Sequence, residues 1–431
     1  MSGIITSVEV VCRIMEHTKG FQNLTRIDDA LRIFLDAVGK PKVKIDHLSV
    51  ERGLGRFLAE DVVSRSPLPS VDISTMDGYA IRAEDVKLAS EQNPVILTVI
   101  GESRLGSRCQ LNVGTDQAVV IATGSKLPSG ADSITAVEQT KTIAPHKVAI
   151  QTPSVKGQSI TTKGEDVAAG DVVLQKGRHL RPEDIGILTG LGVAKVQLVR
   201  EPRVAIISTG NELTNKALKN RPEKVVDVNR PILSAMLRTI GAQPIDLGIV
   251  KDDPKRITAA LKRGLRIADA VLVSAGSSVG RRDLVPRCIE ELGKPGMLVH
   301  GIAMRPALPT GLAVVRGKPI VSLPGFPVSA VVAFRVFVRP LIPQISGLPP
   351  VADQTIRAVL GSTISSGRGW RTFVRVAVRK EQDEWVAEPL KSQKSSALTS
   401  MIKANGIVTI PENQGGYEAG QEVDVCLIGE I

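Results

Sequence analysis

Three glycine-containing loops in the second half of the chain carry residue types that bind phosphate groups. They read TGNE at 209–212, AGSSVGRRD at 275–283 and LPGFP at 323–327, and each directly follows a short apolar run. Small residues allow backbone N–H groups to approach an anion, and a helix that begins at such a loop adds its positive N-terminal dipole. We therefore predict that these loops bind a phosphate-bearing ligand.

The polar side chains of these loops indicate what reaction they would support. Arg281 and Arg282 are suited to pairing with phosphate oxygens, and Asp283 is suited to binding Mg²⁺ or activating a water. Ser329, just after the third loop, would cap the next helix or supply a ligand hydroxyl. A glycine after a strand also makes an ordinary turn, so the prediction depends on all three loops together. None of them matches G-x-G-x-x-G or G-x-x-x-x-G-K-[ST], so we expect the phosphate in another chemical setting.

The segment STMDGYA at 74–80 presents a single carboxylate, Asp77, next to Gly78. It has neither helical nor strand periodicity and follows the proline-rich run SPLPS at 66–70, so we expect a turn held by rigid flanks. Such a turn either serves function or is an ordinary surface turn with Asp-Gly at its corner. The segment alone leaves both interpretations open.

The three strand-end loops need a scaffold that brings them together. From residue 203 onward, strand-like runs alternate with helix-like stretches, in the order RVAIIS, PILSAMLRTIG, PIDLGIV, DPKRITAALKRGL, ADAVLVS and DLVPRCIEELG. This alternation predicts an α/β domain with a parallel-rich sheet, closed by strands MLVHGIAM and PIVSLP and a helix over 328–345. Since ligands bind at the carboxyl ends of strands in such sheets, the three loops would share one edge.

The rest of the chain predicts further helices and smaller β-rich regions. Residues 27–38 have the apolar stripe of an amphipathic helix that ends at Gly39, and Pro182 opens a second helix pattern. Short apolar runs between 95 and 150 predict a β-rich region. Period-two alternation after Pro349 predicts a small C-terminal β domain.

Composition favours a small anionic ligand. The 431-residue chain has 55 Lys and Arg against 44 Asp and Glu, which gives a net charge of +11. Aromatic residues make up only 3%, which argues against single-stranded nucleic-acid binding by base stacking. We find no apolar run of about eighteen residues and no N-terminal signal pattern, so we expect a cytoplasmic protein that binds neither nucleic acid nor membrane. The four cysteines and five histidines lack zinc-site spacing.

Taken in order, the motifs of this chain resemble those of one protein family. The motifs are STMDGYA, ATGSKLPSGAD, KGEDV, STGNEL, DVNR, SSVGRRD, MRPALPTG and LPGFPVSA. They are similar in order and spacing to those of the MoeA and gephyrin E-domain family, the molybdopterin molybdenumtransferases. The resemblance extends from about Thr25 to Ile431.

The resemblance implies an enzyme of molybdenum cofactor biosynthesis. Such an enzyme inserts molybdate, or tungstate, into adenylylated molybdopterin and releases AMP, with Mg²⁺ as cofactor and a MogA-like adenylyltransferase as a partner. It also implies an elongated homodimer whose active cleft lies between the third domain of one subunit and the β-rich second domain of the other.

The resemblance further implies four domains in each subunit, in a multidomain α/β and β fold. These are a discontinuous domain I at 25–67 and 156–200, a β-rich domain II at 68–155, a MogA-like three-layer α/β domain III at 201–346, and a barrel-like β domain IV at 350–431.

Matching motif to motif assigns roles to individual residues. The acidic, catalytic positions are Asp77, Asp166, Glu212, Asp227 and Asp283, of which Glu212, Asp227 and Asp283 would bind the metal. The substrate-binding positions are Thr123, Thr209, Gly210, Gly276, Ser277, Ser278, Gly280, Pro324 and Gly325. The oxyanion-binding positions are Arg305, Ser329, Arg375 and Ser395. Domain II would carry Asp77, Thr123 and Asp132 toward the partner subunit.

Three replacements depart from the family pattern. Leu308 takes the place of the second lysine of K-P-G-K-P, Ala275 replaces a loop glycine, and Phe326 replaces the asparagine of L-P-G-N-P. Loss of a cation from an oxyanion pocket removes a charged hydrogen bond worth about 1.5–3 kcal/mol. The alternative to an active enzyme is therefore a catalytically weak paralogue that acts as a molybdopterin-binding or scaffold protein.

Overall fold

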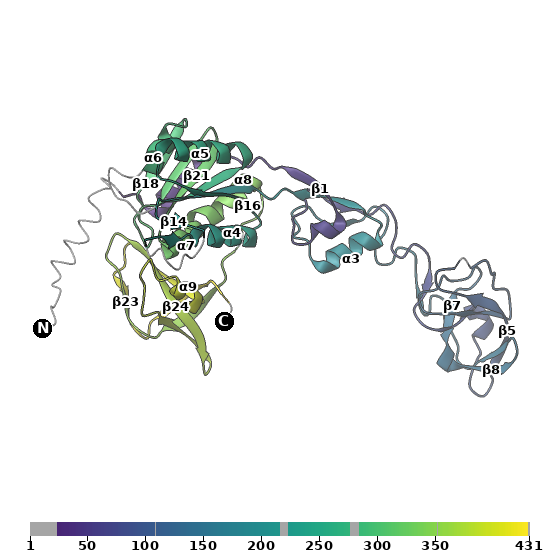
Figure 1. Ribbon diagram of the computed structural model, residues 1–431. Helices are drawn as coiled ribbons and strands as arrows, with labels where there is room; N and C mark the ends of the chain where they lie inside the picture. Colours follow the sequence, from purple (N-terminus) through teal and green to yellow (C-terminus); the bar gives the residue numbers. More distant parts are fainter. Residues whose placement is uncertain (1–23, 108, 216–222, 276–283, 351, 430–431) are drawn as a thin grey trace. The chain divides into compact units, whose positions relative to one another are not determined.

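The computed structural model describes residues 24–107, 109–215, 223–275, 284–350 and 352–429 (Figure 1). The chain forms two compact units: Asp46–Leu198, and a second unit that combines Met1–Ile45 with Val199–Ile431. Most of the predicted 275–283 loop lies outside the described residues.

A six-stranded sheet forms the centre of the larger unit. Its order is β16 (Gln243–Val250), β13 (Arg203–Thr209), β17 (Ala270–Ala275), β21 (Lys318–Pro324), β20 (Gly311–Val315) and β18 (Pro295–His300). The first four strands are parallel, and β20 is antiparallel to both of its neighbours, β21 and β18, so that β18 has the direction of the first four. The parallel-rich sheet is confirmed. Strand β20, whose five residues are all buried, was not predicted, although β17 is buried as continuously and was predicted.

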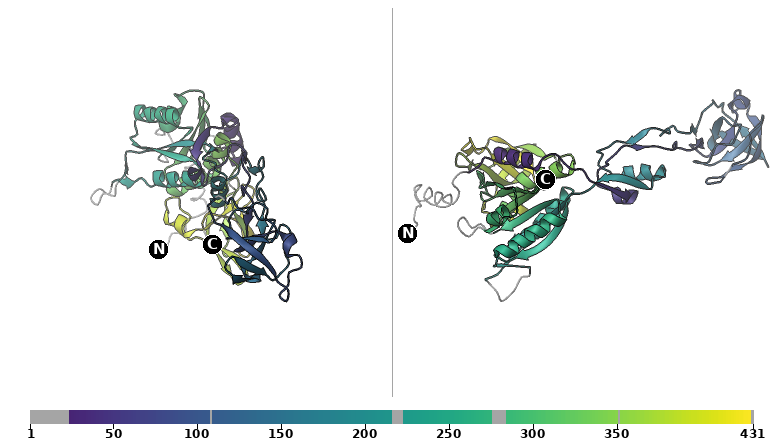
Figure 2. Two further views of the ribbon diagram at one scale, coloured as in Figure 1. Left: turned by 90° about the vertical axis from the view of Figure 1, so that its right-hand side faces the viewer. Right: turned by 90° about the horizontal axis from the view of Figure 1, so that it is seen from above.

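Helices cover both faces of this sheet (Figures 1 and 2). On one face, α5 (Pro254–Ile267) packs against β13 and β17, and α6 (Leu284–Glu290) packs against β18 and β20, in a core that includes Ala205 and Ile207. On the other face, α4 (Asn229–Thr239) and α2 (Ile27–Val38) share a core with Val204 and Ile206. Successive residues of β13 point to opposite faces, and both are covered, which explains its uninterrupted apolar run.

Helix α2 has the bounds that the sequence predicts, and Gly39 ends it with φ of 75°. The sequence grouped this helix with the residues up to 67. In the structure its buried residues Ile27, Ala30 and Phe34 belong to the core of the α/β sheet instead. An amphipathic stripe identifies the buried face of a helix, but it does not identify the surface that covers it.

A long helical segment closes the α/β domain. It consists of α7 (Pro327–Ala333), the π-helical turn η4 (Phe334–Val338) and α8 (Arg339–Ser346). With a mean hydropathy of 1.5 over its apolar window, the segment is long and apolar enough to cross a membrane, contrary to our expectation for this chain. That window is 61% buried within the structure, and Phe334 and Phe337 pack into the sheet's core. Its burial is that of a core helix.

The C-terminal strands close into a five-stranded barrel, as the barrel-like prediction requires. Around the barrel the order is β24 (Arg371–Glu381), β25 (Glu384–Pro389), β22 (Thr355–Leu360), β28 (Glu422–Leu427) and β26 (Gly406–Ile410), and β26 pairs back with β24. Strand β19 (Met304–Arg305) of the α/β domain joins the edge of β24. The smaller elements are α9 (Thr399–Lys403) and the pair β23 (Ile364–Ser365) with β27 (Gly416–Tyr417).

The smaller unit contains a helical part and a β-rich part. In the helical part, α3 (Pro182–Gly190) and the 3-10 helix η1 (Val50–Gly53) pack beside the pairs β1 (Ile45–Ser49) with β12 (Lys195–Val199) and β2 (Val62–Val63) with β11 (Val172–Leu174). Leu58, Leu180 and Leu188 are fully buried there. The prediction that Pro182 opens a helix is confirmed.

The β-rich part is a six-stranded sheet. Its order is β7 (Ser133–Ala136), β4 (Gly78–Ile81), β6 (Gln117–Ile121), β5 (Val95–Ser103), β9 (Lys147–Ile150) and β8 (Thr140–Ala144). The 3-10 helices η2 (Ala83–Val86) and η3 (Val137–Gln139) flank it, and β3 (Ile73–Ser74) pairs with β10 (Ile160–Thr161).

Gly78 has a different role from the one that the sequence suggested. We expected it to serve a surface turn, but it is the buried first residue of β4. A Cβ at this position would lie 2.0 Å from the carbonyl oxygen of Thr135. The glycine is therefore required by close backbone packing against β7, and Asp77 lies at the start of a strand.

Candidate functional site

A cavity of about 530 Å³ lies at the carboxyl ends of the parallel strands in the larger unit. Polar residues from four segments line it: Thr209, Glu212, Asp227, Asn229, Ser274 and Gly325. Ser396 and Leu398, which precede α9, form a further part of its wall. As expected from the sequence, the loops that follow β13 and β21 thus lie together at one edge of the sheet. Pro324, the last residue of β21, precedes the lining residue Gly325.

The loop after β13 begins at Gly210, which adopts φ of 158°. A Cβ on Gly210 would come within 2.7 Å of the Glu212 carboxylate. Two short parallel strands, β14 (Leu213–Thr214) and β15 (Val225–Val226), then carry the chain from Glu212 to Asp227. Glycine therefore allows the carboxylate of Glu212 to remain close to the strand end.

Asn229 fastens two of the strand-end loops to helix α4. Its side-chain NH₂ donates to the hydroxyl of Ser274 at 2.7 Å and to the carbonyl oxygen of Gly325 at 2.9 Å. A carbonyl can only accept, so this geometry fixes the amide orientation. Asn229 is only 5% exposed. Sequence reasoning gave it no role, although it lies in the quoted motif DVNR.

Asp227 is held by an arginine that the sequence did not single out. Its carboxylate accepts from Nε of Arg230 at 2.5 Å and from the backbone N–H groups of Asn229 and Arg230 at 3.1 and 3.4 Å. The Arg230 guanidinium also binds both carboxylate oxygens of Asp246, at 2.6 and 2.7 Å. Burial works to lower the pKa of Arg230, but the hydrogen bonds to Asp227 and Asp246 outweigh it and raise that pKa.

Both oxygens of Asp227 accept hydrogen bonds and the residue is only 7% exposed, so in this structure it positions Arg230 and the first turn of α4. The catalytic and metal-binding role predicted for Asp227 stays a prediction. Glu212, by contrast, is exposed and forms no ion pair with any described residue. Within the described ranges, no group of three acidic, histidine or cysteine side chains could hold a metal ion.

Three of the four predicted oxyanion residues gather beside the start of α7. Val328, next to Ser329, donates its N–H to the carbonyl oxygen of Ser395 at 3.1 Å. The Arg375 guanidinium reaches the carbonyl oxygens of Ser392 and Lys394 at 3.3 and 3.4 Å. Since Ser395 directly follows Lys394, the three predicted residues share one neighbourhood.

Arg375 carries an uncompensated charge in this neighbourhood. It is 1% exposed, and its Nε and Nη1 atoms have no hydrogen-bond partner among the described residues. Burial lowers the pKa of Arg375. A buried cation without an acidic partner is unfavourable unless an anion supplies the missing charge, so this arrangement is suited to binding a small oxyanion.

Arg305, the fourth predicted oxyanion residue, is the last residue of strand β19. It lies opposite Thr372 in the pairing with β24, three positions before Arg375. Its guanidinium carbon lies 4.3 Å from the centre of the Trp370 ring. No contact among the described residues links Arg305 to Ser329 or Ser395.

The smaller unit holds the other predicted acidic residues. Asp77 accepts hydrogen bonds from the backbone N–H and the hydroxyl of Thr123, at 2.7 and 2.9 Å. These bonds, the backbone one foremost, lower the pKa of Asp77. Asp132 accepts from the backbone N–H of Ala83 at 2.8 Å and has a structural role in its own sheet. Asp166 is exposed.

Family comparisons match nearly the whole chain. Residues 25–192 match the MoeA N-terminal region (domain I and II), residues 205–344 a probable molybdopterin binding domain, and residues 357–428 the MoeA C-terminal region (domain IV). A molybdopterin molybdenumtransferase of Bacillus subtilis is 33% identical over 386 residues, which cover 89% of this chain and 90% of that protein. The chain belongs to the MoeA family of molybdopterin molybdenumtransferases.

Other members support the same assignment. Molybdopterin molybdenumtransferase 2 of Mycobacterium tuberculosis is 36% identical over 375 residues, or 86% of this chain and 92% of that one. The crystal structure of a molybdopterin biosynthesis MoeA protein from Pyrococcus horikoshii has a TM-score of 0.81 at 33% identity and covers 95% of this chain and 100% of its own. The resemblance and the multidomain fold with a MogA-like α/β domain are thus confirmed.

Five predicted substrate and metal residues of this MoeA family member fall outside the described ranges. They are Gly276, Ser277, Ser278, Gly280 and Asp283. Of the strand-end loops, those after β13 and β21 can therefore be placed in full, and that after β17 only as far as Ala275.

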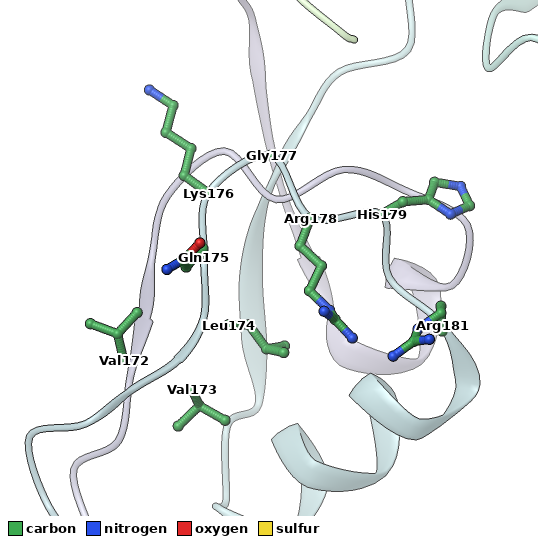
Figure 3. A pocket seen from close by; sticks show the side chains of 9 residues that line it. All are labelled: Val172, Val173, Leu174, Gln175, Lys176, Gly177, Arg178, His179 and Arg181. Carbon is green, nitrogen blue, oxygen red and sulfur yellow. The ribbon is translucent and has the colours of Figure 1, made fainter. Parts of the chain in front are cut away.

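A second cavity of about 670 Å³ in the smaller unit is a weaker candidate site (Figure 3). Lys176, Arg178, His179 and Arg181 line it, but Figure 3 shows Lys176 and His179 pointing away from each other. Arg178 is already paired with Asp184 at 2.7 and 2.9 Å. Arg181 also lies 3.9 Å from Asp184, so the two arginines of this MoeA family member share one carboxylate, and we assign the cavity no function.

Proposed function

We propose that this chain inserts molybdate into adenylylated molybdopterin and releases AMP. The observation that carries the proposal is the strand-end cavity, whose wall includes Ser396, together with the buried guanidinium of Arg375. That guanidinium donates to the carbonyl oxygen of Lys394, and its Nε and Nη1 atoms have no hydrogen-bond partner among the described residues. The cavity is suited to a phosphate-bearing substrate, and the cation to a tetrahedral dianion. Membership of the molybdopterin molybdenumtransferase family supports the reaction class.

The proposed reaction exchanges oxygen for sulfur at molybdenum and cleaves a phosphoanhydride. The two dithiolene sulfurs replace two oxygens of molybdate; in the overall balance, one leaves as water and the other enters the cleaved P–O–P bond, which frees AMP. Thr209 and Gly325 would bind the substrate where Asn229 fixes the loops. Arg375, Ser329 and Ser395 would hold the oxyanion, and Glu212 would face the reacting phosphate.

Mg²⁺ is part of the proposal as a cofactor that neutralises phosphate charge. The fit of the described residues is partial, because Glu212 offers a carboxylate whereas Asp227 is occupied by Arg230. Asp283 and the substrate phosphates would supply the remaining oxygens. No step of the proposal depends on a metal geometry.

We further propose a cytoplasmic homodimer with four domains in each subunit, at the boundaries given above except that α2 joins domain III. A MogA-like adenylyltransferase would supply its substrate, and tungstate is an alternative oxyanion. Neither nucleic acid nor membrane is expected as a partner. Asp77, Thr123 and Asp132 of domain II would then contribute to the site of the other subunit, and Asp166 stays a predicted catalytic residue.

The subunit exchange can be tested with two defective variants. Asp77→Asn and Glu212→Gln subunits, each inactive alone, should recover part of the activity when mixed and allowed to exchange, because one of the two sites in a mixed dimer would be intact. Mixed dimers without activity would place both residues in the same subunit's site.

The proposed reaction is tested by measuring AMP release from adenylylated molybdopterin with Mg²⁺. We expect release that requires molybdate and that falls strongly in Glu212→Gln. A folded chain that binds the substrate but releases no AMP at saturating molybdate and tungstate would favour the scaffold alternative, which the Leu308 replacement supports.

A further inference from the structure

Trp370 lies against one of the predicted oxyanion arginines. The guanidinium carbon of Arg305 lies 4.3 Å from the centre of the Trp370 ring. Cations within about 6 Å of an aromatic ring centre are attracted by the negative face of the ring, most strongly for tryptophan. The contact is therefore a cation–π interaction.

The backbone fixes this contact between the two domains of the larger unit. Strand β19 pairs in parallel with β24, so that Met304 lies opposite Arg371 and Arg305 opposite Thr372. Arg371, directly after Trp370, donates its N–H to the carbonyl oxygen of Ala303 at 3.0 Å. Met304, directly before Arg305, is fully buried. Arg305 and Trp370 thus each lie next to a residue whose position is fixed, by burial for Met304 and by a backbone hydrogen bond for Arg371.

Arg371, next to Trp370 in the sequence, is paired with carboxylates, whereas Arg305 is not. Arg371 donates to both oxygens of Asp28, at 2.8 and 2.7 Å, and lies 3.1 Å from the carboxylate of Glu412. Arg305 is half-buried, and no described carboxylate contacts it. Burial lowers the pKa of Arg305. Because no described carboxylate pairs with Arg305, its charge remains available to an external anion.

We propose that Trp370 is a positioning residue that orients Arg305 toward the oxyanion. Contact with the face of the ring restricts where the guanidinium can lie, and it leaves the N–H donors available for hydrogen bonds to an acceptor. Arg305 can then present two parallel N–H groups to a tetrahedral oxyanion. The inference rests on the proposed function for the identity of that oxyanion, molybdate.

The chain offers a direct spectroscopic test, because it contains only two tryptophans. Trp385, in β25, packs against the barrel core and belongs to no predicted site, so Trp385→Phe leaves Trp370 as the single emitter. We expect molybdate to change the Trp370 emission saturably, and Arg305→Gln to abolish that change. Potassium chloride at matched ionic strength is the control for general salt effects.

Steady-state kinetics separate a positioning role from simple packing. Trp370→Leu should raise the KM for molybdate about 3- to 30-fold, the range expected for loss of a cation–π contact. Trp370→Phe, which keeps an aromatic face, should raise it by less than that. The KM for adenylylated molybdopterin and the melting temperature should change little in both variants.

Two results would overturn the inference. One is an unchanged Trp370 emission at molybdate concentrations that saturate turnover. The other is a loss of melting temperature in Trp370→Leu with both KM values changed alike, which indicates packing. The binding titration needs no pterin substrate. A chain that binds molybdate beside Trp370 but never releases AMP would therefore contradict the proposed function and leave this inference standing.

Discussion

The carboxylate of Asp77 accepts hydrogen bonds from both the backbone N–H and the hydroxyl of Thr123, at 2.7 and 2.9 Å. The two residues come from separate motifs, 46 positions apart, and adjacent antiparallel strands β4 and β6 bring them together. The exposed carboxylate is thus oriented by its own sheet before any partner or ligand binds.

This orientation predicts different effects for the two residues. Asp77→Asn should abolish most of the activity, because the charge is lost. Thr123→Val keeps the backbone hydrogen bond, which is the larger cause of the lowered Asp77 pKa, so it should reduce activity only modestly. We suggest measuring kcat for both variants, and the Asp77 pKa by NMR for the parent protein and Thr123→Val. Equal losses in the two variants would contradict an oriented, charged Asp77.

The Arg230 network predicts a large loss of stability when its cation is removed. Arg230→Met would leave the carboxylates of Asp227 and Asp246 without their partner, and breaking a buried ion pair in this way costs about 3–5 kcal/mol. Denaturant unfolding of the larger unit measures the effect. Arg238→Met, at an exposed position of the same helix, is the matched control and should change the free energy of unfolding by less than about 0.5 kcal/mol.

Asp269 predicts a pH dependence of stability. It accepts hydrogen bonds from Lys44 at 2.9 Å, from Arg200 at 2.9 and 3.1 Å, and from the backbone of Arg203 at 2.8 Å. Burial opposes ionisation of this carboxyl, but these contacts outweigh burial and lower the Asp269 pKa below its ordinary value of 3.8.

A lowered folded-state pKa means that Asp269 stabilises the fold above its ordinary pKa and that this stabilisation is lost as the pH falls through the folded value. The melting temperature of the parent protein should therefore fall more steeply below pH 3.8 than that of Asp269→Asn. Near neutral pH the variant should be the less stable of the two. If the melting temperatures of the parent protein and Asp269→Asn changed with pH in the same way across the acid range, the contacts would contribute no pH-dependent stability.

Leu308 predicts a gain of function. If the oxyanion site lacks a cation there, Leu308→Lys should lower the KM for molybdate about tenfold, as expected for a charged hydrogen bond of about 1.5 kcal/mol. Leu54→Lys adds the same charge at a position that is 56% exposed in the smaller unit and should have no effect. An unchanged KM in Leu308→Lys would favour the scaffold alternative.

The sequence predicted the α/β scaffold and part of the cavity for a physical reason. Strand and helix periodicities are local, and the carboxyl ends of parallel strands meet at one edge, so Glu212 and Gly325 could be brought together from sequence alone. The role of Arg230 could not be predicted, because its second acid, Asp246, lies 16 residues away on the edge strand β16. The role of Gly78 could not be predicted either, because the atom that leaves no room for a Cβ is the carbonyl oxygen of Thr135 on another strand.

In the proposed function, molybdenum insertion and AMP release are one coupled reaction at this cavity. The most direct test is a single-turnover reaction with adenylylated molybdopterin and molybdate, in which AMP and molybdenum bound to the pterin product are both quantified. We predict equal amounts of the two at every time point, and neither product in Glu212→Gln. AMP release at the same rate with and without molybdate, with no molybdenum in the pterin product, would show that the two steps are not coupled.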